Sequence, residues 1–419
     1  MSWNSYDSIK STWHQIKQSR GRNGEKDASV GIDGVTQSIF DKNLENNLRE
    51  IERKLICFLP ENTQVAYSFA ALRTKTISNE PGKLREIHIP RIRDQIVFRI
   101  ISNEIINIIT QKNPNFLKTS PRAVVKRVIR AREAGKKYVL KTDIQNYYPS
   151  IPHEEVLQKL SELGVTNTLV YLVRKALRTP HRDRRKGKSA DREQTRGTAT
   201  GTSLSTVLGE LYLSDLEEKF NGENIQFIRY LDDILVLSAD KNILTDTLTK
   251  LTTELKKRGL QLSDSKTCLK SFDDGFEYLG FRFELNEVLI SSNKSLKWIR
   301  TYQGITKRFV RLIDNTREQK LEILKQMITE INREISGVCG MQVPYYSLAN
   351  DLAEFRELDR QIRETLGGVF RRLNQEMTGD FRLESAFTWA WKYKKNYRSA
   401  KSEAFNKFSD ISVDHLATN

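Results

Sequence analysis

Two adjacent carboxylates interrupt an otherwise apolar stretch of the sequence. They are Asp232 and Asp233 in the segment YLDD (230–233), which has apolar residues on both sides. This pattern predicts a β-hairpin whose tight turn carries both acids. Burying two charges there is costly unless a cation neutralises them, and carboxylate oxygens suit Mg²⁺. Adjacent acids are also common in ordinary turns, so the pair alone is weak support for a metal site.

A third carboxylate follows a second candidate strand. Residues Tyr138 to Thr142 have the pattern of a strand, and Asp143 stands at its end. Pro152 then begins a predicted helix, with two acids in its first turn, as the helix dipole favours. An acid at a strand end can lie beside the acids of a neighbouring hairpin. Carboxylates placed in this way can hold two divalent ions about 3.5–4 Å apart, the arrangement used for phosphoryl transfer to a growing strand.

The surrounding pattern predicts mixed helices and strands. Residues 1–80 are expected to be mostly helical and polar. A turn then leads into a strand from Leu84 to Ile89, and Pro90 ends that strand. The segment after Pro90 has apolar residues at helical spacing, and residues from about 291 to 400 also have a helical pattern.

The chain is strongly basic, with 69 Lys and Arg against 53 Asp and Glu and a formal net charge of +16. Such a surplus favours a polyanionic partner, above all nucleic acid. Residues 118–137 predict a basic amphipathic helix, and the basic segment 181–196 predicts an exposed loop because it has no apolar period. The candidate phosphate contacts in these two segments are Lys126, Arg127, Arg130, Arg184 and Arg185.

Several classes of protein are excluded or disfavoured. No run of 18 or more apolar residues occurs, so no membrane span is expected, and the N-terminal residues lack the apolar core of a signal peptide. Cys57, Cys268 and Cys339 are far apart and form no CxxC pair. This spacing argues against a zinc finger or a disulfide framework and is typical of a protein from a reducing cytoplasm.

Six blocks follow one another along the chain: GIDGVT (31–36), KLREIHIPRIRDQIV (83–97), LKTDIQNYYPSI (140–151), YLDD (230–233), GLQLSDSKT (259–267) and FEYLGFRF (276–283). Their order and spacing resemble those of the bacterial reverse transcriptases of the branch that contains group II intron proteins, retrons and defence-associated enzymes. The resemblance continues more weakly into INREISGV (331–338).

This resemblance implies an α+β right-hand polymerase. Residues 1–80 would form an N-terminal extension and the start of the fingers, and residues 81–290 a fingers–palm domain with an antiparallel palm sheet. Residues 291–419 would form an α-helical thumb and a C-terminal tail.

The resemblance also implies a catalytic site and its cofactor. Asp143 and Asp232 would bind two Mg²⁺ ions, and Asp233 would support the site. The backbone around Ile144 would contribute to the metal site and hold the incoming triphosphate. The primer grip would consist of Tyr278, Leu279 and Gly280.

Five further residues are implied to contact the deoxynucleotide. Lys83 and Arg85 would bind its phosphates, and the ring of Tyr148 would exclude a ribose 2′-OH. Gly201 would let the backbone approach the nucleotide closely, and Lys266 would lie near the leaving pyrophosphate. As alternatives, Tyr148 is an ordinary core aromatic residue and Lys266 an ordinary charge at the end of a helix.

One block departs from the usual pattern. In RGTATGTSLSTVLGELYL (196–213), Ala199 and Thr200 replace the Pro-Gln pair of most reverse transcriptases, while Gly197 and Gly201 remain. The missing Gln puts the usual contact with template and nucleotide in doubt. The block resembles abortive-infection and other defence-associated enzymes more than intron maturases. The length after the thumb and the lack of a Cys-rich segment also argue against a complete mobile-intron protein.

The expected function is synthesis of cDNA from dNTPs on RNA in the bacterial cytoplasm, in defence against bacteriophage and with a dedicated noncoding RNA as template. One alternative is a retron reverse transcriptase that primes on its own structured RNA. A second is an RNA-binding splicing helper with a vestigial site, against which the three intact acids argue. A third, an RNA polymerase, is disfavoured by Tyr148. The sequence gives no indication of primer type or oligomeric state.

Overall fold

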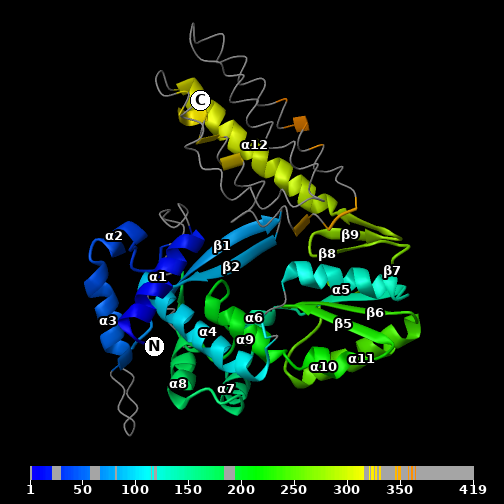
Figure 1. Cartoon of the computed structure of the whole chain (residues 1–419), viewed down its shortest axis with the longest axis horizontal. Helices are drawn as coiled ribbons and strands as arrows, with labels where there is room; N and C mark the ends of the chain where they lie inside the picture. The colour runs from blue at the N-terminus through cyan, green and yellow to red at the C-terminus, as the bar shows by residue number, and fades with distance from the viewer. Residues whose placement is uncertain are drawn as a thin grey trace. The chain divides into compact units, whose positions relative to one another are not determined.

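The computed structural model describes residues 2–20, 30–56, 67–80, 83–114, 116–117, 120–183 and 194–315, and selected residues between 320 and 364 (Figure 1). The chain divides into two compact units. Unit 1 comprises Met1–Ser120 and Ala134–Leu269, and unit 2 comprises Pro121–Glu133 and the residues from Lys270 onward. None of the described helices is both long and apolar enough to cross a lipid bilayer.

Unit 1 is rich in helices that surround a continuous apolar core. In chain order its helices are α1 (Tyr6–Arg20), α2 (Gln37–Asp41), α3 (Leu44–Ile56), α4 (Ile92–Lys112), α6 (Tyr147–Ser150), α7 (His153–Glu162), α8 (Asn167–Leu177), α9 (Ser203–Tyr212), α10 (Leu216–Phe220) and α11 (Lys241–Lys257). The long helix α4 packs against α1, α3, α8 and α9. The helix predicted after Pro90 is therefore confirmed, and it organises the unit.

The first sheet of unit 1 is built on an antiparallel hairpin. Its strands are β1 (Leu72–Glu80) and β2 (Lys83–Ile89), and the short strand β4 (His181–Arg182) pairs with the start of β1 in parallel. The predicted strand 84–89 is confirmed as β2. Two expectations were wrong in part: residues 1–80 include a nine-residue strand, and the basic segment 181–196 begins in a strand.

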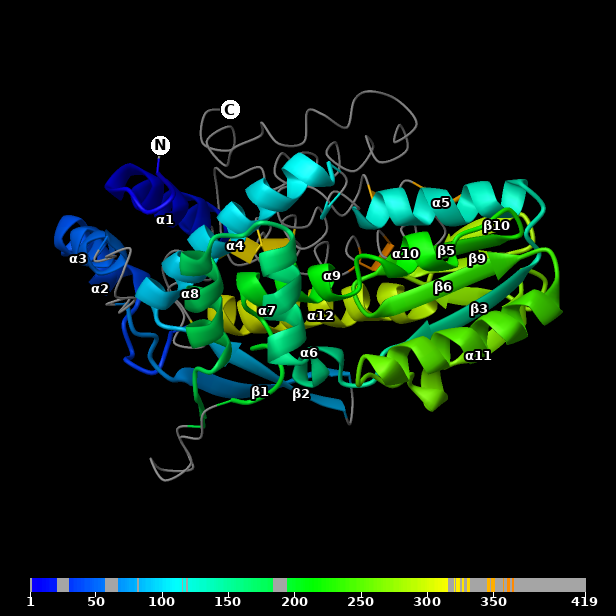
Figure 2. The same cartoon turned by 90° about the horizontal axis from the view of Figure 1, so that it is seen from below.

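The second sheet of unit 1 carries the acidic residues. Its strands are β3 (Tyr138–Asp143), β5 (Ile225–Tyr230), β6 (Asp233–Ser238) and β7 (Cys268–Ser271), in the order β5-β6-β3-β7. Only the first two residues of β7, Cys268 and Leu269, belong to unit 1. Both β5 and β3 are antiparallel to the central strand β6, which confirms the predicted antiparallel palm sheet. Helix α11 lies along β3 and β6 (Figure 2).

The GIDG block packs against the junction between β2 and α4. A Cβ atom on Gly31 would lie 2.7 Å from the Cα atom of Arg91, so a larger residue does not fit there. Arg91 pairs with the fully buried Asp94 at 3.0 Å, and Asp94 also accepts a hydrogen bond from the Tyr67 hydroxyl at 2.8 Å. This ion pair ties the start of α4 to the segment that leads into β1.

Unit 2 combines a small sheet with two basic helices. The strands β8 (Phe276–Tyr278), β9 (Phe281–Glu284) and β10 (Glu287–Ile290) form an antiparallel sheet. The helices are α5 (Pro121–Glu133), which is the predicted basic amphipathic helix, and α12 (Ser292–Asn315), which begins the predicted helical region. Arg132 of α5 donates to the carbonyl oxygens of Leu285 and Glu287, each at 3.3 Å. The described residues thus form an α+β fold, as expected.

Candidate active site

Three carboxylates gather at one end of the β5-β6-β3 sheet. Asp143, the last residue of β3, lies directly opposite Asp233, the first residue of β6. Asp232 precedes Asp233 in the turn between β5 and β6, and its carbonyl oxygen accepts a hydrogen bond from the Ile144 amide at 3.2 Å. The predicted hairpin and the predicted strand therefore bring all three acids together.

Lys266 supplies a cation to this group. Its Nζ atom donates to the Oδ2 atom of Asp143 at 2.5 Å. The segment that carries Lys266 is bound to the end of β3, because Ser263 donates its amide to the Asp143 carbonyl oxygen at 2.8 Å. Lys266 thus lies at the group of acids, where the sequence led us to expect it. Its contact with Asp143 was not predicted from the sequence.

Burial and mutual repulsion change the acidity of two of these carboxyl groups. Burial raises the pKa of Asp233 to about 6, and the charges of Asp232 and Asp143 add to this effect. Burial also raises the pKa of Asp232, again with a contribution from Asp143. Burial alone would lower the pKa of Lys266, but the hydrogen bond and charge of Asp143 raise it above its ordinary value. The site therefore favours binding of positive charge.

The donor set fits hard divalent cations. Carboxylate oxygens of Asp143 and Asp232, with the backbone around Ile144, match the oxygen ligands that Mg²⁺ prefers. In the described part of the chain, no three acidic, His or Cys side chains are already arranged as a metal-binding set. Since Asp143 is paired with Lys266, binding of cations would require this carboxylate to exchange or share that partner.

Tyr148 lies beside the acids on the short helix α6. Burial and the nearby charge of Asp232 raise its pKa to about 12. The neighbouring Tyr147 is the core residue of the pair, since it is 2% exposed and donates its hydroxyl to the Gly209 carbonyl oxygen. The half-buried Tyr148 ring also packs against α9, where a Cβ atom on Gly209 would lie 3.0 Å from it. A gate function of Tyr148 stays a prediction.

The two glycines of the 196–213 block have different neighbours. A Cβ atom on Gly197, whose φ is +84°, would lie 2.6 Å from the Pro149 carbonyl oxygen. Gly201 has a φ of +96° and lies near β2, where the Thr200 carbonyl oxygen accepts from the His88 amide at 2.9 Å. Gly197 is therefore required for close packing, and Gly201 is exposed beside the hairpin of the first sheet.

Of the two cations expected to bind the triphosphate, Arg85 has a described side chain and Lys83 does not. Arg85 is exposed on β2, and its positive charge acts to lower the pKa values of both Tyr148 and Asp232. Its charge therefore acts on the Asp232 carboxylate. Lys83 begins β2, but its side chain lies outside the described residues.

The expected primer grip is the turn between β8 and β9 of unit 2. Tyr278 is buried, and Leu279 and Gly280 both have positive φ angles, 48° and 81°. Tyr345 donates its hydroxyl to the Leu279 carbonyl oxygen at 2.6 Å, and Tyr346 lies against Gly280. Sequence reasoning missed these two tyrosines, because nothing in their spacing links them to a turn so far away in the chain.

Exposed cations lie on both helices of unit 2. On α5, Lys126 and Arg130 are exposed and Arg127 is partly exposed, as an amphipathic helix requires. The expected contacts Arg184 and Arg185 lie outside the described residues. A second basic stripe on α12 was missed, although its helical spacing is readable in the sequence. Its exposed members are Lys297, Arg300, Lys307, Arg308 and Arg311.

Comparison with known proteins gives one family. The model described as "Reverse transcriptase (RNA-dependent DNA polymerase)" matches residues 74–283, which include all three carboxylates. A comparison with curated proteins gives no match.

Solved structures of telomerase are similar at low sequence identity. A C-terminally truncated apo telomerase from Candida tropicalis is 16% identical, with a TM-score of 0.45 over 61% of this chain and 60% of that chain. Telomerase from Candida albicans, in complex with a fragment of telomeric RNA, is 13% identical, with a TM-score of 0.47 over 85% and 69%. Apo telomerase from Candida tropicalis is 13% identical, with a TM-score of 0.48 over 85% and 65%. The chain thus spans less than two thirds of the first of these structures.

Proposed function

Because the chain belongs to the reverse transcriptase (RNA-dependent DNA polymerase) family, we propose that it synthesises DNA on an RNA template at Asp143, Asp232 and Asp233. The observation that carries this proposal is the register of the palm sheet. It sets Asp143 opposite Asp233 and beside the turn that holds Asp232. The stretch that matches the family, residues 74–283, contains all three of these residues.

The residues of the site have different roles in the proposed reaction. Asp143 and Asp232 would hold two Mg²⁺ ions, with the backbone around Ile144. When bound, these ions supply the charge that activates the primer 3′ hydroxyl and stabilises the leaving pyrophosphate. Arg85 binds phosphate oxygens, and Lys266 is close enough to the acids to neutralise charge on the leaving group.

Primer extension tests this activity directly. The purified protein is given a DNA primer annealed to RNA or to DNA of the same sequence, with dNTPs or NTPs and with Mg²⁺ or EDTA. Mg²⁺-dependent incorporation of dNTPs on RNA supports the proposal. A folded protein that incorporates NTPs in preference to dNTPs, or incorporates neither, contradicts it.

We further propose that the template is a dedicated noncoding RNA and that the cDNA serves defence against bacteriophage in the bacterial cytoplasm. Two features support this. The 196–213 block, with Ala199 and Thr200 in place of Pro-Gln, resembles defence-associated enzymes. The basic helix α5 presents exposed cations in addition to those at the catalytic site, and structured RNA is recognised by its backbone and shape.

Sequencing of RNA that copurifies from the native host tests this finer proposal. One dominant RNA encoded beside the gene supports a dedicated template. A product in which that RNA is joined to its own cDNA would indicate the retron alternative. A broad sample of cellular transcripts would contradict the proposal, and intron RNA without any cDNA would indicate the splicing helper.

A further inference from the structure

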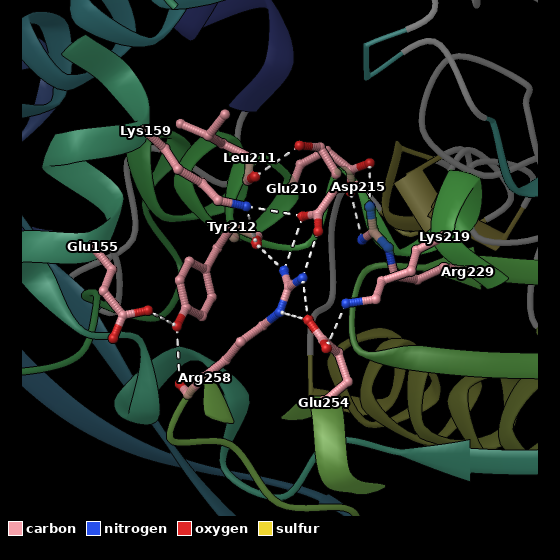
Figure 3. Close-up of polar contacts among 12 residues, drawn as sticks. Glu155, Lys159, Glu210, Leu211, Tyr212, Asp215, Lys219, Arg229, Glu254 and Arg258 are labelled. Atoms are coloured by element: carbon pink, nitrogen blue, oxygen red, sulfur yellow. Dashed lines mark hydrogen bonds and ion pairs between the residues drawn. The ribbon is translucent and has the colours of Figure 1, made fainter. Parts of the chain in front are cut away.

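A buried ion pair stands directly behind the catalytic hairpin. Arg229, near the end of β5, has a side chain that is only 3% exposed. Its guanidinium donates two parallel hydrogen bonds to Glu210 of α9, from Nη1 to Oε2 at 2.9 Å and from Nη2 to Oε1 at 2.7 Å (Figure 3). This planar, two-point geometry is the strong form of an Arg–carboxylate pair, and lysine cannot reproduce it.

The same guanidinium also binds the turn that holds Asp232. Nη1 of Arg229 donates to the carbonyl oxygen of Leu231 at 3.0 Å. That oxygen belongs to the peptide bond between Leu231 and Asp232. By holding this oxygen, Arg229 fixes the orientation of the Leu231–Asp232 peptide and so the backbone position of Asp232.

Leu231 needs such support because of its backbone conformation. Its φ is +57°, in the left-handed region that residues with a Cβ atom rarely adopt. Such a conformation persists where surrounding contacts determine it, and it often occurs at functional sites. The hydrogen bond from Arg229 is a contact of this kind, and the Glu210 carboxylate holds the guanidinium in place to make it.

Both partners are anchored on other elements. Arg229 donates its backbone amide to the Glu217 side chain at 3.1 Å, so the outer edge of β5 is held as well. Glu210 lies in α9, whose first turn is capped by Thr202 and which packs against α4 and α7. The position of α9 therefore determines the position of the Leu231–Asp232 turn, because the Glu210–Arg229 ion pair connects the two.

We propose that Glu210 and Arg229 are positioning residues, which hold the Leu231–Asp232 peptide so that the Asp232 carboxylate faces the divalent ions. This inference rests on the proposed role of Asp232 as a metal ligand. Neither Glu210 nor Arg229 would itself contact metal, nucleotide or primer. Loss of the pair should therefore weaken metal use more than nucleotide binding.

A second ionic network in unit 1 provides a matched control. Arg258 donates to Asp215 at 2.9 Å and to Glu254 at 2.7 Å, and Lys159 donates to the same Asp215 at 2.9 Å (Figure 3). These contacts join α7, α11 and the residue that precedes α10. Arg258 also donates to the carbonyl oxygen of Tyr212, at the end of α9, at 3.3 Å. None of the hydrogen bonds and ion pairs of Arg258 in the described part of the chain involves Glu210, Arg229 or the Leu231–Asp232 turn.

The test replaces the whole ion pair with apolar residues of similar size, as the double variant Glu210→Met with Arg229→Met. This exchange leaves no buried charge without a partner, and replacements of this kind are often tolerated by the fold. We expect kcat for primer extension to fall at least tenfold and the half-saturating Mg²⁺ concentration to rise at least threefold. The KM for dNTP should change less than twofold. Mn²⁺ binding without nucleic acid, followed by electron paramagnetic resonance, should weaken in parallel.

Arg258→Lys should lower the melting temperature while the half-saturating Mg²⁺ concentration stays at the wild-type value. Arg229→Lys keeps a positive charge beside Glu210 and provides a second variant if the double replacement folds poorly. Its half-saturating Mg²⁺ concentration should also rise at least threefold.

The inference is overturned if the Arg229 variants use Mg²⁺ and bind Mn²⁺ as the wild type does. That result leaves the proposed activity intact. A folded wild-type protein that makes no DNA would instead contradict the proposed function. The Mn²⁺ measurement would still show whether the Arg229 variants bind the metal more weakly than the wild type.

Discussion

The Oδ2 atom of Asp143 accepts a hydrogen bond from the Lys266 ammonium group at 2.5 Å, across 123 positions of the chain. This contact places a cation within the group of acids to which we assign the reaction. In the proposed function, Lys266 would exchange its carboxylate partner for the phosphate charge that develops during the reaction.

Lys266→Met should lower kcat on the order of 10²-fold, as removal of one donor to developing negative charge does in other enzymes. The KM for dNTP should change much less. Rapid-quench measurement of single-nucleotide incorporation separates the two constants. Lys257→Met, an exposed position at the end of α11, serves as the control. Equal kcat values for both variants would show that Lys266 has no part in the reaction.

Asp233→Asn should stabilise the metal-free protein at pH 8 and have a smaller effect at pH 5. Burial, with the charges of Asp232 and Asp143, raises the pKa of Asp233 to about 6. An unfolded chain has a value near 3.9. The folded state therefore binds this proton more tightly than the unfolded state. The Asp233 charge costs stability above pH 6, and this cost declines as the pH falls toward 4.

The expected gain in the free energy of unfolding at pH 8 is on the order of 2 kcal/mol. Urea unfolding in EDTA at the two pH values measures it. Addition of Mg²⁺ to the wild type at pH 8 should give a similar gain, because cations offset the same repulsion. A substitution effect that is equal at pH 5 and pH 8 would refute the assignment of this titration to Asp233.

Tyr148→Val should increase the efficiency of rNTP incorporation relative to dNTP. In the proposed gate role the ring would exclude a 2′-OH by its volume, so a smaller side chain would admit the hydroxyl. Tyr148→Phe keeps the ring and should leave the ratio unchanged. The measurement is the quotient of kcat/KM for rNTP and dNTP on one template. If Tyr148→Val and Tyr148→Phe give the same quotient as wild type, Tyr148 is not the gate.

Replacement of Lys126, Arg127 and Arg130 by Gln should make RNA binding less sensitive to salt. Each phosphate contact contributes about 0.9 to the slope of log affinity against log salt for duplexes and about 0.7 for single strands. The magnitude of the slope should therefore fall by roughly 2–3. Matched changes at the exposed α11 residues Lys241, Lys250 and Lys257 should leave the slope as it is. Equal slopes for the two triple variants would mean that α5 does not bind RNA.

The elements with strong apolar periods were the predictable ones. The hairpin around Asp232 and the buried start of α4 could both be read from the sequence. Strand β1 could not be read in this way, because it is polar. Among its described side chains, Leu72 to Ile77, only Leu72 is buried. Its pairing with β2, rather than an apolar face of its own, makes it a strand.

The site was predictable where residue type defines the chemistry. The three acids could be selected from the sequence, with their order and spacing supplied by the family resemblance. The pairing of Asp143 with Lys266 and of Glu210 with Arg229 could not be foreseen. Charged residues are abundant in this chain, and only the tertiary fold decides which of them are buried together.

The most direct test compares Asp232→Asn with Asp246→Asn in extension of a DNA primer on an RNA template, with dNTPs and Mg²⁺. Both substitutions remove one negative charge, but Asp246 is exposed on α11 and does not belong to the group of three acids. Asp232→Asn should lose activity on the order of 10³-fold, because a metal ligand contributes several kcal/mol of transition-state stabilisation. Its melting temperature should stay close to that of Asp246→Asn, which should retain wild-type activity. A folded Asp232→Asn protein with full activity would contradict the account.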